Sequence, residues 1–254
     1  MTDKINFNYG IHYTGSKGNS ASIYYDELGF LIDIGKPYKY IEPLLYDKSF
    51  ILITHIHGDH IKWTTYKKIR EDFPHIKILA NNEVNEELLK RKLKPVDVIF
   101  SDNLQFTIGD VKFTCLQNYH GAGVERADTQ GFILESPHET LLFATDLSTT
   151  IEYSDYLEKN NLKLDVILLE GNYREEVIEF YEMRGHTGFD IFNNGSYRHL
   201  AISEFEEFVE KWKKPDARIK MLHTSDTYGS FEGLLNKSQG KLTEEDVKEW
   251  RSKK

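Results

Sequence analysis

The chain has 254 residues, of which 39% are hydrophobic and 29% charged, as in a soluble globular protein. Its net charge of −9 makes a long nucleic acid an unlikely partner, because proteins that bind polynucleotides usually neutralise many phosphates. No stretch approaches the length of a membrane helix, the N-terminus does not resemble a signal peptide, and the single cysteine excludes an internal disulfide, so one cytoplasmic domain over residues 1–254 is expected.

Short β-branched and aromatic stretches with turn residues between them predict strands along most of the chain. The predicted strands cover 5–13, 21–25, 29–34, 50–53, 76–80, 97–100, 104–108, 111–117, 130–135, 140–144, 165–169 and 218–222. Helical patterns cover 60–72, 82–93, 150–160, 173–182 and 203–213. In the last helix, Ser203 and Glu206 have the spacing of a capping box. Strands followed by helices, twice over, predict an α/β fold of two mixed sheets packed face to face with helices outside.

The segment ITHIHGDHI concentrates three histidines and one aspartate directly after a predicted buried strand. His55 and His57 can point the same way from an extended backbone. A turn at Gly58 then directs Asp59 and His60 towards a second point. Imidazole nitrogens and carboxylate oxygens bind zinc, manganese and iron. Four such ligands are too many for one tetrahedral ion with an open position, so the pattern favours two ions that share a loop.

Three further candidate ligands each follow a predicted strand: His120, Asp146 and His223. A single histidine in such a place is more often a structural hydrogen-bonding residue. Together with the cluster, however, these residues complete a ligand set for two divalent metal ions. Zinc is the expected metal, and the same ligands also suit manganese or iron.

The motifs TGSKGNS, LIDIG, THIHGDH, NYHGAG, FATDLS, YRHLAISEF and MLHTSD follow one another along nearly the whole chain. In this order they resemble the metallo-β-lactamase superfamily, and in particular its phosphodiesterase branch related to tRNase Z. The resemblance implies an αββα sandwich with the metals at one edge. It implies two groups of three ligands and one bridging aspartate: His55, His57 and His120; Asp59, His60 and His223; and Asp146. Asp33 matches an aspartate that orients ligands from outside the metal shell.

The same resemblance implies a general acid near the scissile phosphate, and His199 stands at the matching place. The usual pattern has a serine or threonine within two residues of this histidine, whereas this chain has Ala201. His186 in RGHTG is the alternative general acid. Two bound ions would provide a bridging hydroxide for attack on phosphorus, oriented by Asp59, and the histidine would protonate the leaving group.

Within this branch the chain resembles phage anti-Pycsar proteins, both in length and in the stretch HGAGVERADTQGFIL. This resemblance implies a homodimer that hydrolyses 3′,5′-cyclic mononucleotides such as cyclic CMP and cyclic UMP and so evades host immunity, in the host cytoplasm if the chain is phage-encoded. Gly121, Gly123 and Arg126 in this stretch are candidate substrate contacts. Three tyrosines lie beside candidate site residues in the sequence, Tyr119, Tyr197 and Tyr228, and a base could stack on one of them.

Four other functions are less consistent with the sequence than hydrolysis of a small nucleotide. A DNA or RNA nuclease of the same branch is disfavoured by the acidic balance of the chain. Thioester or lactone hydrolysis is disfavoured by His199 and its surroundings. A redox di-iron role usually replaces the second histidine of the cluster by a carboxylate, so His57 argues against it. A non-catalytic protein that sequesters nucleotides is disfavoured by the complete ligand set.

Overall fold

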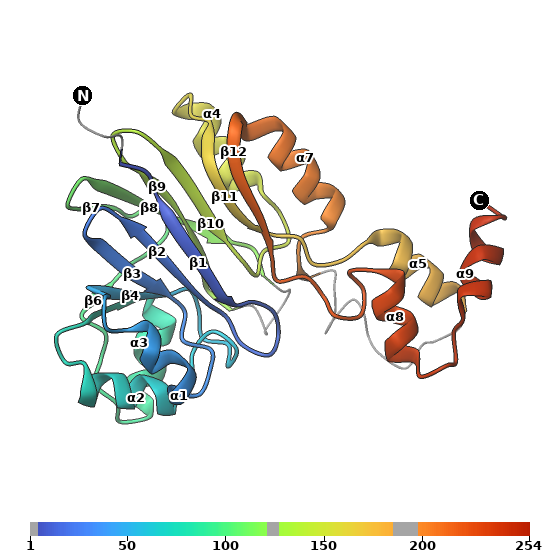
Figure 1. The fold of residues 1–254 in the computed structure, drawn as a ribbon. Helices are drawn as coiled ribbons and strands as arrows, with labels where there is room; N and C mark the ends of the chain where they lie inside the picture. Colours follow the sequence, from blue (N-terminus) through green and yellow to red (C-terminus); the bar gives the residue numbers. More distant parts are fainter. Residues whose placement is uncertain (1–4, 121–126, 185–197) are drawn as a thin grey trace.

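A computed structural model describes residues 5–120, 127–184 and 198–254. Two six-stranded sheets lie face to face with helices on their outer sides (Figure 1). The predicted α/β sandwich of two mixed sheets is therefore confirmed. Within these three described ranges, none of the helices combines the length and the apolar character that a bilayer crossing requires.

The strands of the first sheet lie side by side in chain order. They are β1 (Asn8–Tyr13), β2 (Ser20–Tyr25), β3 (Leu28–Ile32), β4 (Phe50–Ile53), β5 (Lys77–Ala80) and β6 (Val98–Ile99). The first three strands pair antiparallel, and β3 to β6 pair parallel. Parallel neighbours end at the same edge of a sheet, so the loops after β3 and β4 emerge together.

The second sheet has the strand order β12-β11-β10-β9-β8-β7. Its strands are β7 (Gln105–Ile108), β8 (Val111–Asn118), β9 (Thr129–Glu135), β10 (Thr140–Ala144), β11 (Leu164–Glu170) and β12 (Lys213–Leu222). The pairs from β7 to β10 are antiparallel, whereas β10, β11 and β12 run parallel. The segments after β10, β11 and β12 therefore also leave from one edge.

Each sheet has apolar side chains on both faces, because alternate residues of a strand point to opposite sides. In β4, Phe50 and Leu52 join the core between the sheets, while Ile51 and Ile53 pack against helices. The helices beside the first sheet are α1 (Tyr38–Ile41), α2 (Trp63–Asp72) and α3 (Asn82–Lys90), with a 3-10 turn η1 (Glu42–Leu44). The second sheet is covered by α4 (Ile151–Lys159) and α7 (Ile202–Trp212).

Three further helices project from the sandwich: α5 (Glu175–Met183), α8 (Phe231–Ser238) and α9 (Glu244–Arg251) (Figure 1). We call these helices, with residues 239–243 between the last two, the helical arm. The arm has its own apolar cluster, in which Phe180, Leu234 and Trp250 are buried. The sequence patterns predicted α5 but neither α8 nor α9, which are short helices of 8 residues each.

The start of α7 differs from the predicted capping box. The helix begins at Ile202, and the backbone N–H of Ala201 donates to the carboxylate of Glu204 (3.1 Å). Ser203 therefore lies inside the helix, where its hydroxyl donates to Glu175 (2.6 Å). The capping prediction was wrong because a backbone bridge to Tyr173 fixes the chain at Ala201, and the helix starts from there.

Candidate metal centre

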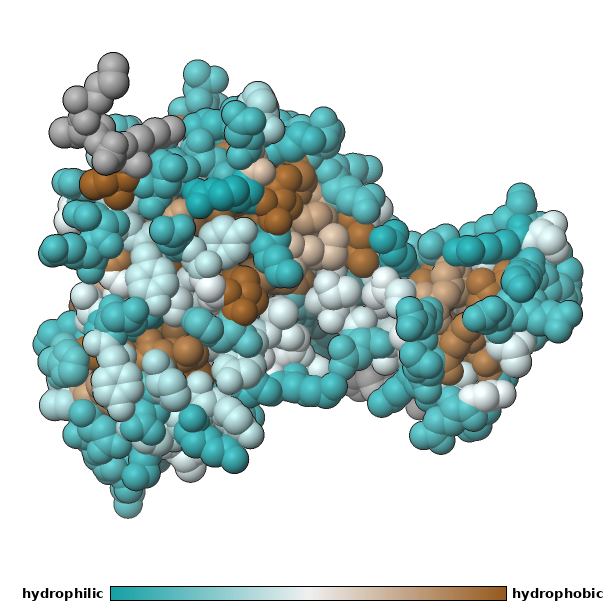
Figure 2. Space-filling model, in the orientation of Figure 1, coloured by the Kyte–Doolittle hydropathy of each residue, from teal (hydrophilic) through white to brown (hydrophobic). Residues whose placement is uncertain are grey.

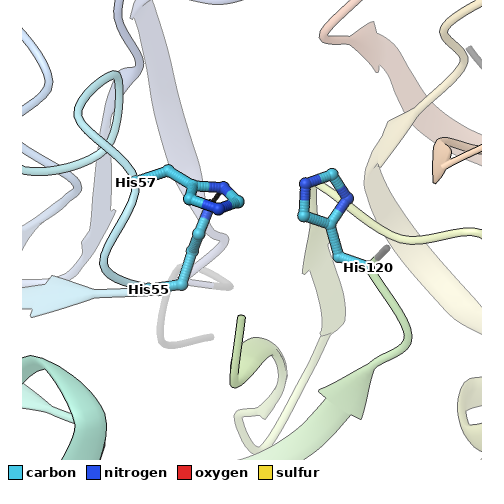
Figure 3. Close-up of side chains that lie close together, drawn as sticks. All are labelled: His55, His57 and His120. Carbon is cyan, nitrogen blue, oxygen red and sulfur yellow. Dashed lines mark hydrogen bonds between the residues drawn. The ribbon is translucent and has the colours of Figure 1, made fainter. Parts of the chain in front are cut away.

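The seven predicted ligands come together at the edge of the sandwich where strands of both sheets end. His55 and His57 follow β4, and His120 follows β8. Figure 3 shows these three imidazoles pointing towards one another from the two sides of the centre. Asp146 follows β10 and His223 follows β12 in the same way. Strand ends from both sheets therefore supply one compact cluster.

Three residues of the centre adopt left-handed backbone conformations within two residues of a strand end. The φ angle is 64° at Asp33, 58° at Asp146 and 53° at His223. Residues other than glycine rarely adopt this conformation, and it persists where the surrounding structure holds it. The N–H of Asp33 donates to the carbonyl of Leu52 (2.9 Å), and that of His223 donates to Oγ1 of Thr14 (2.7 Å). The chain thus turns sharply at these strand ends and is held there.

One group of candidate ligands consists of His55, His57 and His120. Their ligand nitrogens all lie within 4.8 Å of one another. Nε2 of His55 is 2.9 Å from Nδ1 of His57, and His55 and His120 are buried. Two neutral imidazole nitrogens at this distance, Nε2 of His55 and Nδ1 of His57, can bind the same metal ion.

The second group consists of Asp59, His60 and His223, whose ligand atoms also lie within 4.8 Å of one another. Oδ2 of Asp59 is 3.7 Å from Nε2 of both histidines. Asp146 lies between the two groups. One of its carboxylate oxygens is 2.9 Å from Nε2 of His60, and the other is 3.7 Å from Nε2 of His120. This is the placement expected of a bridging ligand.

The outer ring nitrogen of three of these histidines faces a protein oxygen. The contacts are Nδ1 of His60 to Oδ2 of Asp33 (2.7 Å), Nδ1 of His120 to the carbonyl of Arg198 (3.1 Å), and Nδ1 of His223 to Oε1 of Glu170 (3.2 Å). A nitrogen that faces an oxygen acceptor carries the proton, which directs the Nε2 lone pair towards the centre. The surrounding protein therefore orients the rings for metal binding.

Asp33 holds more than one element of the centre. It is fully buried and accepts hydrogen bonds from the backbone N–H (2.8 Å) and the hydroxyl (3.0 Å) of Thr54 as well as facing His60. Thr54 precedes His55, so one carboxylate ties β3 to the loop that carries the cluster. The contacts place Asp33 where it can orient His60, and the role that the LIDIG motif implied for it stays a prediction.

Close backbone contacts fix the loop that carries Asp59. Its carbonyl accepts from the backbone N–H of Asn19 (2.7 Å), and the carbonyl of Asn19 accepts from Gly35 (3.0 Å). A Cβ at Gly35 would lie 1.6 Å from the carbonyl oxygen of Asp59, so only glycine fits there. Residues of the TGSKGNS and LIDIG motifs thus hold the backbone of the loop that carries Asp59, and Asn19 and Gly35 are not themselves candidate ligands.

The carboxylates and imidazoles of the centre shift one another's pKa values. Burial would raise the pKa of Asp146, but His223 and His60 hold it well below its ordinary value. Burial would lower the pKa of His60, but Asp146 and Asp33 raise it to about 10. At His120 burial prevails and lowers the pKa to about 4. Binding of a divalent ion would therefore displace protons from the more basic histidines.

The donor set fits divalent metal ions. Among the described residues, four buried side-chain polar atoms have no hydrogen-bond partner, and one of them is Nε2 of His223. A buried polar atom without a partner is costly, and a metal ion would satisfy this nitrogen. Histidine nitrogen and aspartate oxygen are also ligands of borderline metals such as zinc and iron.

His199 lies beside this cluster, and Glu170, which the sequence patterns did not single out, holds it there. Nδ1 of His199 is 2.6 Å from Oε1 of Glu170. Glu170 is fully buried, and its other oxygen accepts from the backbone N–H of Leu147 (2.9 Å). The only available signal was its position at the end of the apolar strand β11, the same strand-end position as the ligands.

A cavity of about 450 Å³ opens beside the centre. Its lining includes His199, His223 and Asn172. Residues 14–17, residues 224–228 and Lys237 of α8 complete the lining. A pocket of this size can hold a small organic ligand next to the cluster.

Several predicted site residues receive no structural description. Gly121, Gly123, Arg126, His186 and Tyr197 lie outside the described residues. Of the other two tyrosines, Tyr119 donates its hydroxyl to Glu152 (3.0 Å) and does not line the cavity beside the centre. Tyr228 does line that cavity.

Comparison with known proteins identifies the family. Residues 35–223 match the model of the beta-lactamase superfamily domain, so the chain belongs to this superfamily. The protein is thus a member of a superfamily of metal-dependent hydrolases with the metallo-β-lactamase fold. No curated protein matches the sequence.

Several solved structures share the fold at low sequence identity. The metallo-β-lactamase fold protein YhfI from Bacillus subtilis is 14% identical, with a TM-score of 0.64 over 93% of this chain and 92% of that one. A diphosphatase of the PhnP family is 17% identical, with a TM-score of 0.61 over 94% and 92%. The short form of human tRNase Z is 13% identical, with a TM-score of 0.59 over 85% and 92%.

Proposed function

We propose that the protein is a metal-dependent phosphodiesterase that hydrolyses small nucleotides, with 3′,5′-cyclic mononucleotides as the first substrate class. The observation that carries this proposal is the position of His199. The buried carboxylate of Glu170 holds its ring beside the candidate metal ligands, at the wall of a cavity of about 450 Å³. Hydrolysis of a phosphodiester needs a proton donor for the leaving oxygen in just such a place.

The seven predicted ligands would hold two divalent ions, zinc in the first instance. One ion would bind His55, His57 and His120, the other would bind Asp59, His60 and His223, and Asp146 would bridge them. When bound, the ions would supply positive charge to the phosphate and an activated water nucleophile.

His199 is the proposed general acid. Burial would lower the pKa of His199, but the Glu170 carboxylate raises it above its ordinary value. The raised pKa favours the protonated ring, and with Nδ1 bound to Glu170 this ring can donate a proton from Nε2 to the leaving oxygen. His186, which lies outside the described residues, remains the alternative acid.

Asp59 is the second catalytic residue of the proposal. Burial would raise its pKa, but His223 and His60 lower it, so the carboxylate stays ionised. It can accept a hydrogen bond from the attacking water and so orient it. Asp59 is half-buried, whereas Asp146 is buried, which leaves Asp59 the more accessible of the two carboxylates.

The substrate class rests on the sequence resemblance to the tRNase Z branch and to anti-Pycsar proteins. Two of the similar structures are a diphosphatase and a tRNase Z, which supports phosphorus chemistry on this fold. An anti-Pycsar role in immune evasion, a homodimer and a cytoplasmic site of action complete the proposal.

The test is to incubate metal-reconstituted protein, at a concentration far below that of substrate, with a panel of 3′,5′-cyclic mononucleotides. Chromatography should detect linear monophosphates with the wild type and none with Asp59→Ala. The exposed aspartate Asp155 on α4 provides the matched control, because Asp155→Ala should keep full activity. Protection of the nucleotides without turnover, with both metals present, would instead indicate sequestration. Cleavage of oligonucleotide ends alone would move the substrate to the nuclease class.

A further inference from the structure

We propose that a second cavity, in the helical arm, binds the nucleobase of the substrate. This inference rests on the proposed function, because it assigns the part of the nucleotide that lies away from the scissile phosphate. The arm cavity has a volume of about 590 Å³ and lies against Tyr181 of α5, the last turn of α8 and Leu242. That volume is within the range of ordinary small-molecule sites.

The arm cavity adjoins the cavity beside the metal centre. Thr227, Tyr228 and Lys237 line both of them. A molecule whose phosphate lies against His199 and His223 can therefore extend past these three residues into the arm. The shared wall links the proposed chemistry to a separate place for recognition.

The lining of the arm cavity fits a planar heterocycle with hydrogen-bond acceptors. Tyr181, Tyr228, Leu234 and Leu242 provide aromatic and apolar surface, and the two tyrosine rings pack edge to face with centroids 5.7 Å apart. Bases bind such surfaces through their ring faces. A free phosphate would gain nothing from this apolar part of the lining.

The polar part of the lining consists mainly of hydrogen-bond donors. Lys237, Gln239 and Lys241 contribute two ammonium groups and one amide, and no described residue of the lining is an aspartate or glutamate. Carbonyl oxygens and ring nitrogens of a base are acceptors that these donors can bind.

The two lysines are also suitable for mutation. Both are exposed, and neither forms an ion pair with any residue in the described part of the chain. Lys241 lines only the arm cavity, whereas Lys237 lines both cavities. Lys248 on α9 is exposed on the same arm but lines neither cavity, so Lys248→Ala is a matched control.

The experiment compares two substrates that share the scissile ring. One is a nucleoside 3′,5′-cyclic monophosphate, and the other is methyl riboside 3′,5′-cyclic phosphate, which has no base. With full-length, metal-loaded protein, Lys241→Ala should raise KM for the nucleotide about fivefold to tenfold and leave kcat unchanged, as expected for a lost binding contact. Neither parameter should change for the base-free substrate, and Lys248→Ala should behave as the wild type with both.

Three results would overturn the arm assignment. The wild type could show the same kcat/KM with and without a base, Lys241→Ala could leave both substrates unaffected, or it could change both equally. Thermal melting of each variant checks that the fold is retained.

The proposed function fails in a different way, because the wild type would then hydrolyse neither substrate. In that case calorimetry with the cyclic nucleotide decides the arm assignment by itself. Binding that Lys241→Ala weakens would uphold a nucleoside site in the arm, whereas binding that is absent or unaffected would end it.

Discussion

The metal centre and the helical arm are built in opposite ways. The centre consists of buried side chains at strand ends of two sheets, held by hydrogen bonds from residues such as Asp33 and Glu170. The arm consists of three short helices with their own apolar cluster, and its cavity exposes lysines that lack ion pairs among the described residues. Under the two proposals, the reaction would take place in the sandwich and the base would be recognised in the arm. Variants of the centre should therefore affect metal and turnover, and variants of the arm should affect selectivity.

The largest effect is expected from the residue that joins both ligand groups. Asp146→Asn tolerates the left-handed backbone at this position but removes the buried carboxylate. Hydrolysis should fall about a thousandfold, the scale seen when a major electrostatic group leaves an active site. Metal analysis after dialysis should also show a loss of bound ion. Full metal content and full activity in this variant would exclude Asp146 as a bridging ligand.

The next effect separates the two candidate acids. His199→Gln should lower kcat about a hundredfold while metal content is retained, because the proposed role is proton transfer rather than ligation. His186→Gln is the companion variant and should leave kcat close to that of the wild type. The reverse result would transfer the role of acid to His186.

A smaller effect is expected from the residue that orients His60. Asp33→Asn keeps an oxygen acceptor for Thr54 and suits the left-handed backbone, but it removes the negative charge beside His60. Metal affinity should fall about tenfold, as for other changes just outside a metal shell. Competition with a chelator measures it. An unchanged affinity would limit Asp33 to holding the loop.

The smallest effect concerns the arm alone. Hydrogen bonds from the Thr243 hydroxyl and backbone, at the start of α9, lower the pKa of Asp246 below its ordinary value of 3.8. The ionised carboxylate therefore stabilises α9 above that pH, and this stabilisation is lost as the pH falls through the lowered pKa. Amide exchange in metal-free protein, corrected for its intrinsic pH dependence, should show α9 losing protection in acid before β4 and β11 do. Asp246→Asn should reduce this pH dependence, because Glu249 in α9 also has a lowered pKa and would remain. Equal loss in all three elements would mean that the arm does not open separately.

Sequence patterns located the candidate ligands because each is a local feature, a histidine or aspartate a few residues after an apolar strand. His55, His57, Asp59 and His60 fall within six consecutive positions, and His120, Asp146 and His223 each follow one strand. Glu170 was missed because it is the last residue of β11 and is indistinguishable in sequence from any acid at a strand end. The start of α7 was misplaced because a backbone contact to Tyr173, distant in sequence, determines it.

The sequence by itself determined which residues are candidate metal ligands and which strands precede them, since both depend on residue type and short-range pattern. Only the tertiary structure decided which of these residues meet. The two sheets bring His57 and His120 together across a long chain separation, and Glu170 reaches both His199 and His223. The two cavities that Tyr228 and Lys237 both line likewise depend on Lys237 of α8 lying near residues 224–228, which follow β12. Contacts of this kind depend on packing between distant segments, which no local pattern specifies.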